Sequence, residues 1–227
     1  MAHDAPLYPV SLVVAGRPCL VVGGGHVAAR KIEGLLACGA DVTAVAPEMT
    51  GAVEDLAGGG AVGGAVGGAV DGAGSLHLER RPYRAGEASA YRLVVTATGL
   101  PEVDHAVAAD AEAAGVWVNS ADDPANCSFL LPAVHRDGPV TVAVSTGGSS
   151  PALAGWLRTT VADALGPHLP ELAALLDDAR GRLRRSGRST ESIDWRPILD
   201  GPVVALVRDG RTDEARTVLW EALGLQR

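Results

Sequence analysis

Residues 18–48 read PCLVVGGGHVAARKIEGLLACGADVTAVAPE, and this stretch decides the fold. A short apolar run over 19–22 ends in three glycines, as expected for a strand covered on both faces of a parallel sheet. The apolar residues that then recur at helical spacing are Ala28, Ile32, Leu35 and Leu36. Gly39 stands where a helix commonly ends, and a second apolar run follows over 42–46. Strand, glycine turn, helix and strand within about 30 residues predict a βαβ unit.

The same alternation of strands and helices continues along the chain. Further strands are expected at 76–79, 92–96, 116–119 and 139–145. Helices are expected at 102–114, from Pro151 onward, and over most of the remainder after residue 165. Residues 58–74 repeat GGAV three times, and we expect a mobile excursion there, without an assigned function. The pattern predicts the α/β class: a Rossmann-type, doubly wound parallel sheet followed by a helical C-terminal part.

The composition excludes several classes of protein. The 227 residues carry a net charge of −8 with 47% apolar and 20% charged residues, which is typical of a globular chain without a general affinity for nucleic acid or anionic membranes. The first residues lack the basic region of a signal peptide, and no apolar run reaches the ~20 residues of a membrane span. Three separated cysteines without a CxxC motif indicate a reduced, cytoplasmic protein, and the six histidines show no metal-ligand spacing.

The glycine turn predicts a dinucleotide site. Residues 23–28 match G-x-G-x-x-A directly after a strand and at the start of a helix. Gly23 allows the sharp turn, Gly25 lets a pyrophosphate approach the backbone, and Ala28 keeps helix and strand close. Glu48 follows the motif by ~20 residues, where an acid commonly binds the ribose hydroxyls, and no arginine stands beside it, which favours NAD over NADP. The alternative is a glycine turn without a ligand.

Two further segments follow strands and carry polar groups. Asn119-Ser120-Ala121-Asp122-Asp123-Pro124 lies at the carboxyl edge of the expected sheet, where Asp122 is a candidate general base. The alternative is that Asp122 and Asp123 only cap a turn before Pro124. Ser145-Thr146-Gly147-Gly148-Ser149-Ser150 offers hydroxyls and unhindered N–H groups, which favours a site for anionic groups of a substrate. The alternative is a loop with an N-cap at Ser150.

In this order, the motifs GGGHVA, NSADDPANCSFLLPA and VAVSTGGSSPALA resemble the siroheme synthase amino-terminal family of precorrin-2 dehydrogenases and sirohydrochlorin ferrochelatases. The resemblance spans roughly residues 7–165. It implies an oxidoreductase that oxidises precorrin-2 to sirohydrochlorin with NAD, and in many members a lyase activity that inserts Fe²⁺ to give siroheme. It also implies a homodimer.

The resemblance assigns roles to individual residues. The nucleotide site would be lined by His26, Val27, Pro47, Glu48 and Thr98. The catalytic carboxylate would be Asp122. From their own place after strands, Asn119 and the Ser145–Ser150 loop are the candidates for contact with the substrate. The family usually has a branched residue in place of Ser120. The implied domains are an NAD-binding domain at 1–131, a dimerisation segment at 132–163 and a helical domain at 164–227.

Three other functions remain open at this point. The chain could be a dehydrogenase without chelatase activity, and the sequence does not separate this from a bifunctional enzyme. A nucleotide-sensing regulatory module shares the fold but would not need the Asp122 turn or the Ser145–Ser150 loop. A scaffold with a degenerate site is disfavoured by the intact glycines and by Asp122.

Overall fold

The computed structural model describes residues 6–58, 74–121 and 123–225. Nearly all of the GGAV repeat, and Asp122, therefore lie outside the described residues. The described chain forms two compact units, which we treat separately. The first, the Rossmann unit, comprises residues 6–58, 74–121, 123–132 and 145–153. The second, the helical unit, comprises residues 133–144 and 154–225. The expected segment 132–163 is thus shared between the two units, and its role in dimerisation stays a prediction.

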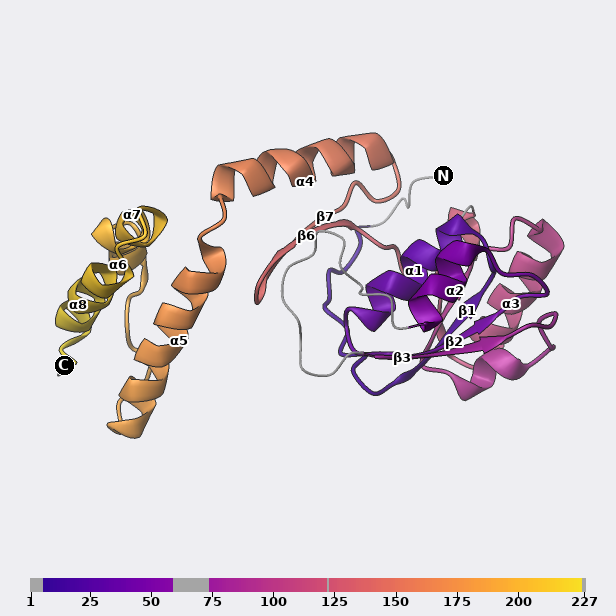
Figure 1. The fold of residues 1–227 in the computed structure, drawn as a ribbon, viewed down its shortest axis with the longest axis horizontal. Helices are drawn as coiled ribbons and strands as arrows, with labels where there is room; N and C mark the ends of the chain where they lie inside the picture. Colours follow the sequence, from indigo (N-terminus) through magenta and orange to yellow (C-terminus); the bar gives the residue numbers. More distant parts are fainter. Residues whose placement is uncertain (1–5, 59–73, 122, 226–227) are drawn as a thin grey trace. The chain divides into compact units, whose positions relative to one another are not determined.

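The Rossmann unit contains a parallel sheet in the order β3-β2-β1-β4-β5 (Figure 1). Its elements are β1 (Pro18–Val22), α1 (His26–Leu36), β2 (Asp41–Val45), α2 (Gly51–Ala57), β3 (Ser75–Glu79), η1 (Glu87–Ala90), β4 (Leu93–Thr96), α3 (Pro101–Ala113), β5 (Trp117–Ser120) and η2 (Pro124–Asn126). All four strand pairs are parallel, so the carboxyl ends of the strands share one edge. The predicted α/β, Rossmann-type fold class is confirmed.

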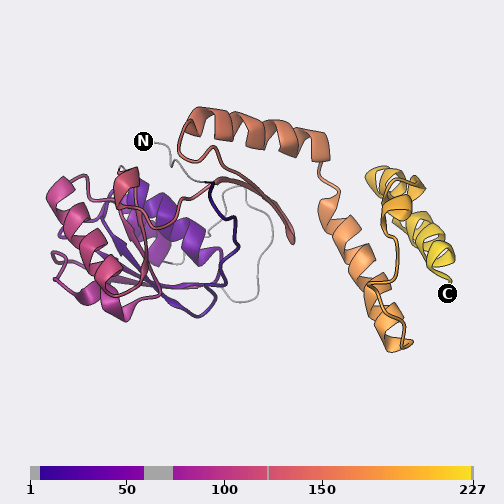
Figure 2. The ribbon, with the colours of Figure 1, turned by 180° about the vertical axis from the view of Figure 1, so that it is seen from behind.

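Two apolar clusters cover the two faces of this sheet. Cys19, Val21 and Val95 pack with α1 and α2 on one face. Leu20 and Val94 point to the other face and pack with α3. Because neighbouring residues of a strand point to opposite faces, both clusters need the continuous apolar runs seen in the sequence. Figures 1 and 2 show the helices of the Rossmann unit from opposite sides.

The helical unit holds a hairpin and most of the C-terminal helices. Its elements are β6 (Ala133–Asp137), β7 (Val140–Val144), α4 (Pro151–Leu165, whose first turn belongs to the Rossmann unit), α5 (Leu169–Arg185), α6 (Arg196–Leu199), α7 (Pro202–Arg208) and α8 (Thr212–Leu223). Strands β6 and β7 pair antiparallel. Leu175, Leu183, Val207 and Leu219 belong to the buried core of α5, α7 and α8, so the prediction of a helical C-terminal part is confirmed.

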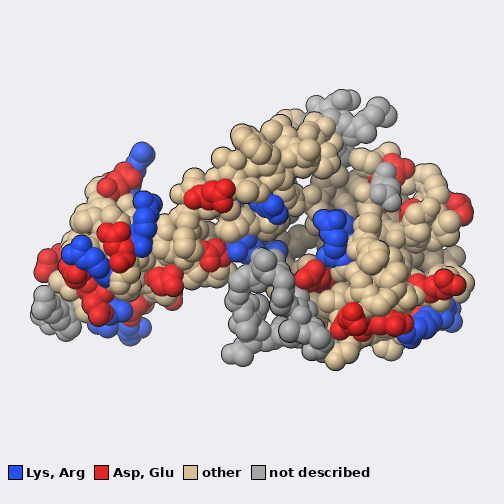
Figure 3. Space-filling model, turned by 45° about the horizontal axis from the view of Figure 1, so that its top comes forward, with Lys and Arg blue, Asp and Glu red and all other residues tan. Residues whose placement is uncertain are grey.

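The surface agrees with the acidic, mixed composition. On the face shown in Figure 3, basic and acidic side chains are interspersed over α5–α8, while few charged side chains lie over α4. Among the described residues, no helix combines the length and the apolar character that crossing a bilayer requires. None of the described cysteines, Cys19, Cys38 and Cys127, forms a disulfide bond.

Removing buried volume from β4 should destabilise the Rossmann unit. Val94 is fully buried, so Val94→Ala should lower the free energy of unfolding by about 2 kcal/mol through lost burial and an unfilled cavity. Val13 is 85% exposed, so the same change there should alter stability by less than about 0.5 kcal/mol. Urea unfolding followed by far-ultraviolet circular dichroism measures both variants. Equal losses would contradict the burial of β4.

Candidate functional site

The glycine turn after β1 lies against the ends of two neighbouring strands. Gly23 has φ +136°, and a Cβ there would lie 2.3 Å from the carbonyl oxygen of Ala97, just past β4. A Cβ on Gly24 would lie 2.0 Å from the carbonyl oxygen of Glu48, past β2. Neither position can therefore hold a side chain without moving the backbone. The turn brings together the predicted cofactor residues that follow β2 and β4.

Gly25 differs from the other two glycines because a Cβ there would meet nothing within 4 Å. It is the N-cap of α1 and forms no side-chain capping bond. The first N–H groups of a helix have no acceptor within the helix, so those of His26, Val27 and Ala28 are available at this end. The side chains of His26 and Val27 are exposed. This open helix N-terminus fits a phosphate group of a dinucleotide.

Residues after β2 lie beside the glycine turn, at the same edge of the sheet. Pro47 and Glu48 are both exposed, so the Glu48 side chain is accessible to a ribose. Thr50 donates its hydroxyl hydrogen to the carbonyl oxygen of Gly24 at 3.0 Å, and its N–H donates to the same oxygen at 2.9 Å. Thr50 thus fixes the glycine turn. Nothing in the sequence indicated this role beyond the position of Thr50 after the second strand.

Thr98 is held by a buried carboxylate that the sequence analysis missed. Asp104, in the first turns of α3, is 6% exposed. Its Oδ1 accepts hydrogen bonds from the hydroxyls of Thr96 and Thr98, the latter at 2.7 Å, and from Thr98 N–H at 3.3 Å. The Thr98 hydroxyl also accepts from Leu100 N–H at 3.0 Å. The only proton of this hydroxyl is taken up within the protein, by Asp104 Oδ1 or by the carbonyl oxygen of Leu100 at 3.2 Å, so Thr98 can offer a ligand an acceptor.

The turn after β5 is clamped by Cys127. Its Sγ accepts from Ser120 N–H at 3.2 Å and lies 3.3 Å and 3.4 Å from the carbonyl oxygens of Ser120 and Asp123. Burial raises the pKa of the Cys127 thiol, so the sulfur keeps the proton that it donates to one of these carbonyls. Asp122 lies within this turn but outside the described residues. Its role as the catalytic residue stays a prediction.

Asn119 and Asp123 serve the same turn. Asn119 is 5% exposed, and its amide nitrogen donates to the carbonyl oxygen of Phe129 at 3.1 Å. The Asp123 carboxylate accepts from Ala125 N–H at 2.9 Å, so it caps η2 as the alternative from the sequence suggested. The predicted contact of Asn119 with substrate is not tested by these bonds.

The Ser145–Ser150 loop is ordered by its own hydroxyls. Thr146 Oγ1 accepts from Ser150 N–H at 3.1 Å, and Ser150 Oγ accepts from Leu153 N–H at 3.2 Å, which is the expected N-cap of α4. Gly147 and Gly148 both have positive φ, +61° and +85°. Within the described residues, the Gly148 N–H and the Ser149 hydroxyl have no hydrogen-bond partner and stay available to an anionic group.

The loop lies near the turn after β5. A Cβ on Gly148 would lie 3.8 Å from the Leu130 side chain, and Leu130 follows Phe129, which bonds to Asn119. Leu130 is thus the residue through which the loop approaches the segment that follows β5. Over the described ranges, no three His, Cys, Asp or Glu side chains come together as a metal site.

Two family models match the chain. The model described as "Putative NAD(P)-binding" matches residues 10–133, more than half of the 227 residues. The chain belongs to this NAD(P)-binding family. A second model, described as "Sirohaem biosynthesis protein central", matches residues 137–164. The glycine turn and the open N-terminus of α1 are the parts of the Rossmann unit that fit such a nucleotide.

Curated relatives of this family member are siroheme synthases. The protein from Methylococcus capsulatus is 36% identical over 217 residues, which cover 94% of this chain and 43% of the relative. The protein from Chromobacterium violaceum is 36% identical over 222 residues, which cover 92% of this chain and 42% of the relative. The chain thus spans less than half the length of these relatives. The resemblance to the siroheme synthase amino-terminal family is confirmed.

A solved structure gives the same fold. The structure of SirC, described as a precorrin-2 dehydrogenase, matches with a TM-score of 0.67 and covers 96% of this chain and 100% of its own. At 23% sequence identity this likeness concerns the fold alone. Because the match covers 96% of this chain, it includes residues of both the Rossmann unit and the helical unit.

Alanine at two neighbouring glycines should separate folding from binding. Gly24→Ala should lower the free energy of unfolding by about 3 kcal/mol, because its Cβ would overlap the Glu48 backbone. Gly25→Ala has open space and should leave stability unchanged or raise it by up to about 1 kcal/mol, yet weaken NAD⁺ binding about tenfold by blocking the phosphate. Thermal unfolding and calorimetric titration with NAD⁺ measure the two effects. Undiminished binding by Gly25→Ala would contradict the phosphate position.

Proposed function

We propose that this chain oxidises precorrin-2 to sirohydrochlorin with NAD⁺ as the hydride acceptor. The observation that carries this is spatial: the glycine turn and the turn containing Asp122 follow β1 and β5 of one parallel sheet, so both belong to the same edge. Relatives named siroheme synthase, and the fold shared with a precorrin-2 dehydrogenase, agree with this substrate.

The chemistry divides between cofactor and protein. Bound NAD⁺ would take a hydride from the tetrapyrrole. Asp122 would accept the accompanying proton, so that substrate loses one hydride and one proton in total. The Cys127 clamp would hold the turn that carries Asp122. The carboxylates of the tetrapyrrole would bind the Gly148 N–H and the Ser149 hydroxyl, local donors that an acidic protein needs for an anionic substrate.

Charge near the end of β2 favours NAD over NADP, because Glu48 would repel the 2′-phosphate of NADP. Strand β3 lies beside β2 in parallel register, so the residues that follow β3 lie at the same edge of the sheet. The two arginines that directly follow β3 are already paired: Arg80 with Glu54 at 2.5 Å, and Arg81 with Glu79 and Glu87. Paired arginines offer less positive charge to a 2′-phosphate.

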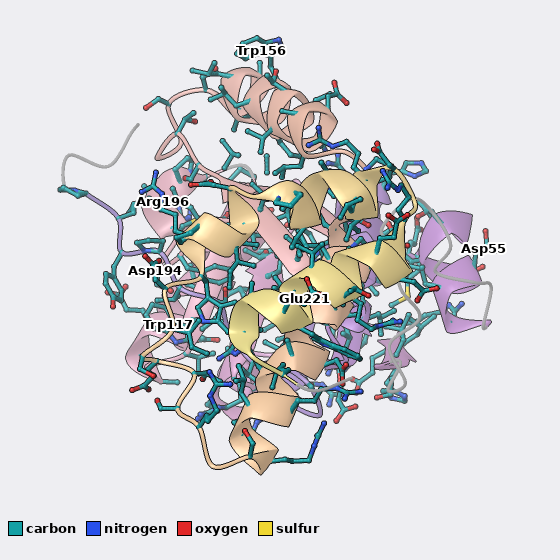
Figure 4. All side chains as sticks on the ribbon, turned by 90° about the vertical axis from the view of Figure 1, so that its left-hand side faces the viewer. Asp55, Trp117, Trp156, Asp194, Arg196 and Glu221 are labelled. Atoms are coloured by element: carbon teal, nitrogen blue, oxygen red, sulfur yellow. The ribbon has the colours of Figure 1, made fainter. Side chains whose placement is uncertain are left out.

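We also propose that the protein is a cytoplasmic homodimer that pairs through the segment 132–163. In α4 only Ala154 is buried, whereas Leu153 and Trp156 are 47% and 63% exposed. Trp156 projects away from the helix in Figure 4. Apolar side chains of this size that lie exposed together on one helix are typical of a protein interface.

Insertion of Fe²⁺ into sirohydrochlorin is the second activity that we propose, with the ion as a substrate. An enzyme limited to the dehydrogenase step is the alternative. Incubation of the purified protein with sirohydrochlorin and Fe²⁺ or Co²⁺, without NAD⁺, separates the two by the absorbance of the metallated product. An absorbance assay with precorrin-2 and either NAD⁺ or NADP⁺ tests the first activity and the choice of cofactor.

Asp122→Asn tests the proposed base. The variant keeps the size of the side chain but cannot take up the proton, so precorrin-2 turnover should fall at least ~100-fold while NAD⁺ affinity stays unchanged. Asp55→Asn is the matched control, because Asp55 is exposed on α2, away from the turn after β5, and its change should cost little activity. Full activity of Asp122→Asn would remove Asp122 from the mechanism.

Trp156→Glu tests the proposed dimer. A charge in the centre of the interface should raise the dimer dissociation constant at least ~10-fold, as measured by analytical ultracentrifugation. Trp117 is 52% exposed but belongs to the Rossmann unit, so Trp117→Glu should leave the oligomeric state unchanged. Dissociation by Trp117→Glu alone would place the interface elsewhere.

A further inference from the structure

A cavity of about 220 Å³ lies within the Rossmann unit at the start of α3, beside the ends of β4 and β5. The side chains that matter in its lining are Asp104, His105, Ser120, Asp123 and Asn126. The cavity adjoins the glycine turn through one residue, Thr98. A Cβ on Gly23 would lie 3.4 Å from Thr98 N, and the Thr98 hydroxyl bonds to Asp104 at 2.7 Å.

One buried group of this lining lacks a partner, and a second group has an oxygen that accepts no hydrogen bond. Ser120 is 4% exposed, and its Oγ has no hydrogen-bond partner among the described residues. All three hydrogen bonds to the Asp104 carboxylate end on Oδ1, and Oδ2 accepts none from the described part of the chain. Buried polar groups are nearly always paired, so the unpaired Ser120 hydroxyl on this cavity indicates a missing ligand group. Asp104 Oδ2 is a further acceptor in the same lining.

The remaining polar groups narrow the chemistry of this ligand. Asp123 accepts from Asn126 Nδ2 at 3.2 Å and lies 3.4 Å from His105 Nε2, so Asn126 and His105 both pair with Asp123. The Asp104 carboxylate disfavours an anionic group, which excludes the carboxylate side chains of a tetrapyrrole. A ligand group with both a donor and an acceptor can donate to Asp104 Oδ2 and pair with the Ser120 hydroxyl, which itself both donates and accepts. A primary carboxamide carries an N–H donor and a carbonyl acceptor on one carbon atom.

We propose that this cavity binds the carboxamide of the nicotinamide ring, with its NH₂ donating to Asp104 and its carbonyl oxygen accepting from Ser120. The inference rests on the dinucleotide of the proposed function. It deepens that function by naming Ser120 and Asp104 as the residues that select the amide form of the cofactor and fix the orientation of its ring.

Calorimetric titration without tetrapyrrole tests this. NAD⁺ should bind at least ~10-fold more tightly than 3-acetylpyridine adenine dinucleotide, which lacks the NH₂, and than nicotinic acid adenine dinucleotide, which carries a carboxylate. Ser120→Ala should weaken NAD⁺ about tenfold, leave ADP-ribose binding unchanged, and raise the melting temperature of the ligand-free protein because an unpaired buried hydroxyl is removed. Asp104→Asn should reduce the preference for NAD⁺ over the carboxylate analogue.

The control is Ser89→Ala, since the Ser89 hydroxyl bonds within η1 and lies outside the cavity lining. Equal affinity of the wild type for NAD⁺ and both analogues, or unchanged NAD⁺ affinity of Ser120→Ala, would overturn the inference and leave water as the occupant. The analogue affinities of the wild type and the NAD⁺ affinity of Ser120→Ala test the inference even if Asp104→Asn does not fold. Absent binding of ADP-ribose would instead overturn the cofactor of the proposed function.

Discussion

The structure depends on the contact between the glycine turn and the backbone that follows β2 and β4. Gly23 and Gly24 lie so close to Ala97 and Glu48 that no side chain fits between them. This contact sets where α1 begins, and with it the direction of the free N–H groups at its start. It also places Thr98 beside the turn, so that the buried Asp104 network becomes part of the same site. A single steric requirement therefore organises both the phosphate end and the far end of the crevice.

Most of the Rossmann unit could be predicted because strands buried in a parallel sheet consist of consecutive apolar residues. The runs around 19–22, 42–46 and 92–96 each became a strand of the central sheet. Strand β6 was not predicted, since AVHRD over 133–137 lacks an alternating pattern and forms only by pairing with β7. Helix α2 was also missed, because seven residues are too few for a helical period to stand out.

Site residues could be predicted where they belong to a local sequence motif. They could not be predicted where their role depends on hydrogen bonds to residues outside such a motif. The glycine motif and the acid that follows the second strand were identified from spacing, and the structure brings Glu48 and Thr98 to the turn. Asp104 and Cys127 gave no signal, because their importance comes from hydrogen bonds to backbone and hydroxyl groups several residues away. Ser120 was noticed only as a departure from a family pattern. Its burial without a partner is visible only in three dimensions.

The position of β1 in the sheet has a consequence for biosynthesis. This strand is the first of the sheet to leave the ribosome, yet it lies in the middle, between β2 and β4. Until Leu93–Thr96 have been translated, one side of β1 is an open apolar edge. The whole GGAV repeat must therefore be translated before β4 can pair with β1. During that interval the exposed edge favours binding of chaperones.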